Sequence, residues 1–261
     1  MLFFNLRSDR AREITKSFVQ EQFNEKNPGS FTRKKVLKNL RFVAMTDFGP
    51  NLENSLTAFP SRDLIDTLPM IMRDYKQLYI SESEKFAHVT YFFNGGYSDP
   101  VGGEDCLMIP SPDVRSYDLK PEMSALKITS KVILYLKEKA YNFVTVNFPN
   151  PDMVAHTGNL KAGIKTVEVV DQCVGKISEQ VIKDKGTLII TADHGNVEEM
   201  INLKTGEIDT KHSTNPVPFI LVNDKIGKKK LKSDGILGDV APTILKLAST
   251  DKPKIMREGM I

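Results

Sequence analysis

The chain has 261 residues, of which 40% are hydrophobic and 26% charged, an ordinary composition for a globular protein of one or two domains. The net charge of +3 is too small to predict binding to nucleic acid or to a membrane surface, and no apolar run approaches the ~20 residues that span a bilayer. The first residues do not read as a signal peptide, and Cys106 and Cys173 form no Cys-x-x-Cys pair. We therefore expect a reduced, cytoplasmic setting.

The first sixty residues have a mixed pattern that predicts three elements: a strand over 2–6, a helix over 8–22 and a strand over 40–45. Residues 47–62 contain several Gly, Pro and Asn residues and read as a loop. A domain boundary is expected at its end, which divides the chain into residues 1–62 and 63–261.

From residue 63 onward, predicted strands alternate with predicted helices. The strands are expected at 77–80, 88–93, 141–148, 187–191 and 217–222, and the helices at 64–73, 121–138, 160–183 and 239–247. The run 187–191 has the apolar character of a fully buried strand. This alternation predicts an α/β fold with a largely parallel sheet covered by helices on both faces, and ligand sites at the carboxyl ends of its strands.

Three polar segments beside these strands carry three of the four histidines. Asp152 and His156 follow the strand 141–148, and their spacing places both on one face of a helical turn. Asp193 and His194 follow the strand 187–191 directly, and His212 precedes the strand 217–222. Each segment alone also fits an ordinary alternative, such as an exposed aspartate, a tight turn or a hydrogen-bonded loop histidine.

Taken together, the three segments predict a metal centre. Carboxylate and imidazole ligands suit a divalent metal such as manganese or zinc, and cobalt is an alternative. Two aspartates and three histidines are too many ligands for one ordinary catalytic ion and too few for two closed sites. Two metals with incomplete coordination fit this count better, and such pairs suit phosphoryl transfer.

Three basic residues are candidates for binding an anion. Arg7 and Arg10 lie three apart at the start of a predicted helix, where both guanidinium groups would converge on one anion or form an exposed basic turn. Lys85 lies near a predicted strand end, where it would meet a phosphate or a carboxylate, or remain solvated. His88 reads as a packed strand residue.

Several long strings resemble cofactor-independent phosphoglycerate mutase, and together they extend over nearly the whole chain. They are residues 3–12, 84–96, 109–112, 117–125, 150–158 and 191–196. The resemblance is to the C-terminal part of this family, which belongs to the alkaline phosphatase superfamily. It implies an alkaline-phosphatase-like layered sheet, incomplete at its N-terminal part and forming residues 63–261. Residues 1–62 would be the remnant of a second, transferase α/β domain and a hinge.

The resemblance also implies an isomerase of glycolysis. Family members interconvert 3-phosphoglycerate and 2-phosphoglycerate through a phosphoserine, with two Mn²⁺ ions (Zn²⁺ or Co²⁺ in their place) and without 2,3-bisphosphoglycerate. Carried over by motif, one metal would be held by Asp152, His156 and His212, and the other by Asp193 and His194. Substrate would be bound by Arg7, Arg10 and Lys85.

No residue of this chain matches the family's nucleophilic serine, which a preceding segment supplies together with another aspartate and the first strand of the sheet. We therefore assign no catalytic nucleophile here, and we expect the chain to be inactive or weakly active alone. Either the sequence is a fragment of a longer protein, or the missing N-terminal half is a separate chain. The full-length enzyme is expected to be a monomer that binds phosphoglycerate.

Two other functions remain open. In the first, the chain is part of another metal-dependent phosphatase of the superfamily or of a phosphopentomutase. Residues 117–125 and the segment of Arg7 and Arg10 disfavour both of these enzymes. In the second, the chain is a non-catalytic metal-binding subunit. The presence of all five candidate ligands disfavours this function.

Overall fold

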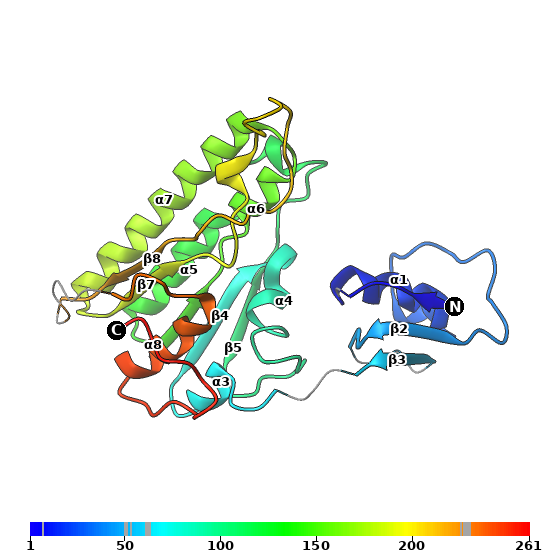
Figure 1. Ribbon diagram of the computed structural model, residues 1–261, viewed down its shortest axis with the longest axis horizontal. Helices are drawn as coiled ribbons and strands as arrows, with labels where there is room; N and C mark the ends of the chain where they lie inside the picture. Colours follow the sequence, from blue (N-terminus) through cyan, green and yellow to red (C-terminus); the bar gives the residue numbers. More distant parts are fainter. Residues whose placement is uncertain (7, 50–51, 53, 61–63, 225, 227–230) are drawn as a thin grey trace. The chain divides into compact units, whose positions relative to one another are not determined.

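The chain folds into two compact units, Met1–Leu64 and Ile65–Ile261 (Figure 1). The computed structural model describes residues 1–261 except 7, 50–51, 53, 61–63, 225 and 227–230. The predicted boundary between residues 62 and 63 therefore lies outside the described residues. The transferase and phosphatase roles of the two parts stay predictions.

The first unit is a parallel sheet packed on a helix. Its strands are ordered β1 (Leu2–Phe3), β2 (Phe42–Thr46) and β3 (Ser55–Phe59), and its helices are α1 (Asp9–Val19) and α2 (Phe23–Lys26). Phe42 and Ala44 on β2 pack with Ala11 and Val19 of α1. On the other face, Leu2 and Leu56 flank Val43 in register and are 62% and 63% exposed. β3 corrects the prediction of a loop over 47–62.

The second unit is built on the strand β4 (Gln77–Glu82), in which all six residues are buried. It pairs in parallel with β5 (Asp105–Ile109) on one side and with β6 (Phe143–Val146) on the other. Because side chains alternate along a strand, Ile80 and Tyr79 point to opposite faces. Ile80 packs in the cluster beneath the long helices, and the Tyr79 ring contacts Phe93 and Phe143 edge to face.

Helices cover both faces of this sheet, as the sequence predicts (Figure 1). On the Ile80 face lie α5 (Ala125–Lys137) and α7 (Leu160–Lys183), which contribute Ile128, Val132, Ile177 and Val181. On the other face, α3 (Leu68–Ile71) and α8 (Val240–Leu247) pack through Leu68 and Leu245. The remaining short helices are α4 (Phe86–Val89), α6 (Asn150–Ala155) and 3-10 turns at Ser83–Lys85, Tyr117–Leu119, Val197–Glu199 and Leu237–Asp239.

Two strands depart from the predicted parallel sheet. β7 (Leu188–Thr191) and β8 (Phe219–Val222) form an antiparallel pair, separate in hydrogen bonding from β5-β4-β6 among the described residues. β7 was expected to be fully buried. Three of its residues are only half-buried and Thr191 is exposed, and β8 is the one described strand that pairs with it.

The predicted strand over 88–93 is wrong. Residues 86–89 form α4, and the chain then turns through local hydrogen bonds from Phe92 N to Ala87 O (3.0 Å) and from Asn94 N to Thr90 O (2.8 Å). The Thr90 hydroxyl also donates to Phe86 O, so this hydroxyl and several backbone groups are satisfied within the segment. β5 takes the place of this strand beside β4, and the sequence pattern did not predict it. In the part of the chain that the structure describes, no helix combines the length and apolarity needed to cross a membrane.

Glu82 ends the central strand with a fully buried side chain, and its Oε1 accepts a hydrogen bond from Ser124 N at 2.8 Å. Burial raises the pKa of Glu82 above its ordinary value of 4.5, against the lowering effect of that hydrogen bond. The folded chain therefore binds this proton more tightly than the unfolded chain. The contribution of Glu82 to stability is favourable below pH ~4.5 and is lost as the pH rises through its folded pKa.

We expect Glu82→Gln, which keeps an acceptor for Ser124 N, to raise the free energy of unfolding at pH 7 and to change it little at pH 4. Urea unfolding at both pH values measures this difference. Glu179→Gln, on an exposed position of α7, is the matched control. Equal effects of Glu82→Gln at the two pH values would contradict the prediction.

Candidate metal centre

The centre of the site is Asp152, on the first turn of α6. Pro149 and Pro151 start this helix with backbone angles preset for it. Buried Asn150 fixes it in place, because its amide donates to Pro121 O (3.1 Å) and Glu122 O (2.7 Å). The Asp152 side chain is 14% exposed as a result.

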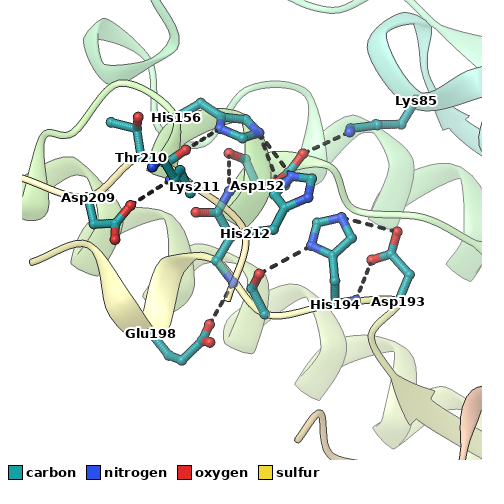
Figure 2. Close-up of polar contacts among 12 residues, drawn as sticks. Lys85, Asp152, His156, Asp193, His194, Glu198, Asp209, Thr210, Lys211 and His212 are labelled. Atoms are coloured by element: carbon teal, nitrogen blue, oxygen red, sulfur yellow. Dashed lines mark hydrogen bonds and ion pairs between the residues drawn. The ribbon is translucent and has the colours of Figure 1, made fainter. Parts of the chain in front are cut away.

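The structure brings Asp152, His156 and His212 together (Figure 2). Nε2 of His156 lies 3.2 Å and Nε2 of His212 lies 3.1 Å from Asp152 Oδ1, and the two Nε2 atoms are 3.2 Å apart. One ligand atom from each of the three residues lies within 4.8 Å of the others. His156 reaches this point because α6 continues helically to its end, so positions 152 and 156 share a face. His212 arrives from a loop distant in sequence.

A backbone carbonyl orients His156. Its Nδ1 lies 2.8 Å from Thr210 O, an acceptor, so Nδ1 carries the proton and Nε2 offers its lone pair. This is the arrangement by which proteins fix the tautomer of a metal-binding histidine. The donor set, one carboxylate oxygen and two imidazole nitrogens, therefore fits a divalent first-row metal.

Two donors hold the carboxylate of Asp152 in its charged form. Lys85 Nζ lies 2.7 Å from Oδ2, and Asn196 Nδ2 lies 2.7 Å from Oδ1. Burial alone raises the pKa of Asp152, but the hydrogen bonds from Lys85 and Asn196 outweigh it and lower this pKa to about 2. Burial and the nearby His194 lower the pKa of His212. Near neutral pH the site thus presents a carboxylate and a neutral imidazole, the forms that bind metal.

The second predicted ligand pair, Asp193 and His194, lies beside this group. Asp193 is 67% exposed, and its Oδ2 is 3.5 Å from His194 Nε2. The His194 ring stacks on the His212 ring with centroids 3.8 Å apart. The two predicted ligand sets are therefore adjacent, and the metal-binding role of all five residues remains a prediction.

The predicted substrate residues lie in different units. Arg7 lies outside the described residues, and Arg10 is exposed on the first turn of α1. Lys85, in the second unit, contacts Asp152 directly, so it is placed at the candidate centre. His88 lies on α4, against the Phe92 ring.

Sequence reasoning missed three polar residues that support the site. Asn196 donates to Asp152, while Glu198 and Ser213 are hydrogen-bonded to each other next to His212. Asn196 directly follows the Asp193-His194-Gly195 string, and this position is the only feature of the sequence that indicates a role for Asn196 at the site. Nothing in the sequence indicates that Glu198 and Ser213 would meet.

Comparison with known proteins gives the relatives of the chain. The Metalloenzyme superfamily matches residues 45–252. Proteins named 2,3-bisphosphoglycerate-independent phosphoglycerate mutase from Clostridioides difficile and Clostridium botulinum are 47% identical over 258 residues, which is 98% of this chain and 49% of each relative. A solved Leishmania mexicana phosphoglycerate mutase, crystallised at low cobalt concentration, superposes with a TM-score of 0.86 at 31% identity, over 99% of this chain and 50% of that one. The chain thus spans about half the length of the relatives it matches.

Proposed function

Because the chain belongs to the Metalloenzyme superfamily, we propose that it acts as the C-terminal part of a 2,3-bisphosphoglycerate-independent phosphoglycerate mutase. Such an enzyme interconverts 3-phosphoglycerate and 2-phosphoglycerate, a reaction of glycolysis in the cytoplasm. The observation that carries the proposal is the convergence of Asp152, His156 and His212 on one point, in a chain that superposes on a phosphoglycerate mutase over nearly its whole length.

In this proposal two Mn²⁺ ions, or Zn²⁺ or Co²⁺, occupy the site. Asp152, His156 and His212 would hold one, and Asp193 and His194 would hold part of the other. When bound, the metals would stabilise negative charge on the phosphoryl group and lower the pKa of a hydroxyl nucleophile. Neither set closes a metal's coordination, which would leave positions for substrate and for ligands from the part of the relatives that this chain does not match.

The protein groups have the complementary tasks. Lys85 would contact a phosphoryl oxygen, since its ammonium group already lies at the candidate centre, where it forms an ion pair with Asp152. Arg7 and Arg10 would bind the carboxylate or phosphate of phosphoglycerate from the first unit. The Thr210 carbonyl would keep His156 in the tautomer that presents Nε2. Because no serine of this chain matches the family nucleophile, covalent catalysis would need a second segment.

Reconstitution tests this function. We expect the chain with Mn²⁺ alone to convert 3-phosphoglycerate to 2-phosphoglycerate several powers of ten more slowly than a complete enzyme, since it lacks the nucleophile. Adding the part of the Clostridioides difficile relative that this chain does not match should restore turnover, measured by coupling 2-phosphoglycerate to its dehydration. Full activity of the chain alone would refute the need for a second segment.

The same assay separates the alternatives. Hydrolysis of a generic phosphate ester by the reconstituted protein, without mutase turnover, would favour a phosphatase of the superfamily. Turnover of a pentose phosphate in place of phosphoglycerate would favour a phosphopentomutase. Metal binding without mutase, phosphatase or phosphopentomutase activity would favour a non-catalytic subunit.

A further inference from the structure

Two loops meet at the candidate centre, and each carries a candidate ligand. Residues 193–196 form the first loop, which contains His194, and residues 212–215 form the second, which begins with His212. Their backbones are joined by an antiparallel bridge between Gly195 and Ser213, in which Ser213 N donates to Gly195 O at 2.9 Å. A side-chain tie between the loops would add a second connection to this bridge and help to fix the separation of the two candidate ligands.

The carboxylate of Glu198 supplies that tie. Its Oε2 accepts a hydrogen bond from Asn196 N, on the first loop, at 2.8 Å. Its Oε1 accepts from the hydroxyl of Ser213 and from Asn215 Nδ2 (3.1 Å), both on the second loop. Each carboxylate oxygen is thus bound to a different loop, and an ionised carboxylate suits this position because it accepts from two N–H groups and from the Ser213 hydroxyl.

Gly195 has the space that this tie requires. A Cβ atom at position 195 would lie 2.2 Å from both Glu198 Oε1 and Ser213 Oγ. Real Cβ atoms do not approach so closely, so any larger residue would push the carboxylate and the hydroxyl apart. The Glu198–Ser213 contact lies next to the backbone at position 195, and this explains why a glycine follows His194.

The tie acts on the candidate ligands through their immediate neighbours. Asn196, whose N–H bonds Glu198, donates its side-chain amide to Asp152 Oδ1 at 2.7 Å. Ser213 follows His212, whose Nε2 lies 3.1 Å from the same oxygen. The stacking of the His194 and His212 rings depends on the same separation of the loops.

We propose that Glu198 is a positioning residue that sets the spacing between the His194 loop and the His212 loop and thereby raises the metal affinity of the centre. The proposal rests on the proposed function in that Asp152, His156 and His212 bind the metal. Residues that orient metal ligands from outside the coordination sphere typically contribute about 10–100-fold in metal affinity.

The test is calorimetric titration of the 261-residue chain with Mn²⁺. Glu198→Gln has the same shape but places an NH₂ group against Asn196 N–H or against the Ser213 and Asn215 donors, so the Kd for Mn²⁺ should rise about 10–100-fold. Ser213→Ala should weaken binding in the same direction, and Ser213→Thr, which keeps the hydroxyl, should restore it. Combining Glu198→Gln with Ser213→Ala should weaken binding no more than Glu198→Gln alone, because both remove one tie.

Glu207→Gln is the matched control, because it removes the same charge nearby from a carboxylate without a hydrogen bond or ion pair among the described residues. Unchanged Mn²⁺ affinity in Glu198→Gln, or in Ser213→Ala should Glu198→Gln fail to fold, overturns the positioning role alone. No Mn²⁺ binding by the wild-type chain, either alone or with the added part of the Clostridioides difficile relative, overturns this role and the proposed function together. In EDTA, Glu198→Gln should still unfold cooperatively on heating, as Glu207→Gln does, and loss of the cooperative transition in Glu198→Gln alone would show a folding role instead.

Discussion

Replacing Asp152 with asparagine is expected to abolish high-affinity Mn²⁺ binding by the chain. Asp152 is the shared neighbour of both histidines, so its loss removes the charged ligand and the point on which they converge. The amide would also turn an NH₂ group toward either the Lys85 ammonium or the Asn196 amide. The loss of affinity should exceed the roughly 10–100-fold that is typical of residues outside the coordination sphere.

Calorimetric titration with Mn²⁺ measures this loss, and Asp171→Asn on the exposed side of α7 is the matched control. In the reconstituted enzyme, the same substitution of Asp152 should remove mutase turnover. If the Asp152→Asn chain binds Mn²⁺ as tightly as the wild type, the three-residue group is a polar cluster and not a metal site.

The largest effect on stability is expected at Ile80, in the middle of the central strand. Its side chain is fully buried and packs against α5 and α7. Ile80→Ala would leave a cavity there, because the paired strands on both sides hold the backbone in place. The expected loss is about 2–5 kcal/mol in the free energy of unfolding, or about 4–20 °C in the melting temperature of a unit of this size.

Urea unfolding followed by circular dichroism measures the change, and Ile164→Ala provides the control. Ile164 lies on α7 and is 56% exposed, so the same truncation there should change stability by less than about 0.5 kcal/mol. Similar losses at the two positions would mean that β4 is not the centre of the core.

The sequence predicted best those elements whose signal is local and periodic. The helix 160–183 has the bounds of α7, since its apolar residues recur at helical steps and Asn159 caps its start by accepting from Ala162 N. The pairing of Asp152 with His156 was predictable for the same reason, because one helical turn fixes their relation. In both cases the information lies within a few residues.

The failures come from segments in which tertiary contacts decide. Residues 88–93 are aromatic and β-branched like a strand, but local hydrogen bonds and ring contacts keep them in a helix and a turn. β5 follows a glycine-rich stretch and its sequence lacks a clear apolar and polar alternation, so its pairing with β4 could not be read locally. The antiparallel pairing of β7 with β8 likewise depends on the route of the loop between them.

The candidate site shows the same division. The ligand types were apparent because three of the four histidines lie beside predicted strands, and the resemblance to a known family assigned them to two sets. Glu198 was not predictable, because its importance arises only where the loops of Gly195 and Ser213 meet. A solvated glutamate would have the same local sequence.

The wide separation along the chain of the residues around Asp152 affects how the protein is made. Lys85 and His212, which both contact Asp152, are 127 positions apart. At ~5–20 residues per second of synthesis, His212 follows Lys85 by about 6–25 s. The Tyr75 hydroxyl meets Ala248 O only after a further stretch, across 173 residues of chain. Lys85 and β4 therefore leave the ribosome well before His212, and the polar centre can close only after the residues on both sides of this interval have emerged.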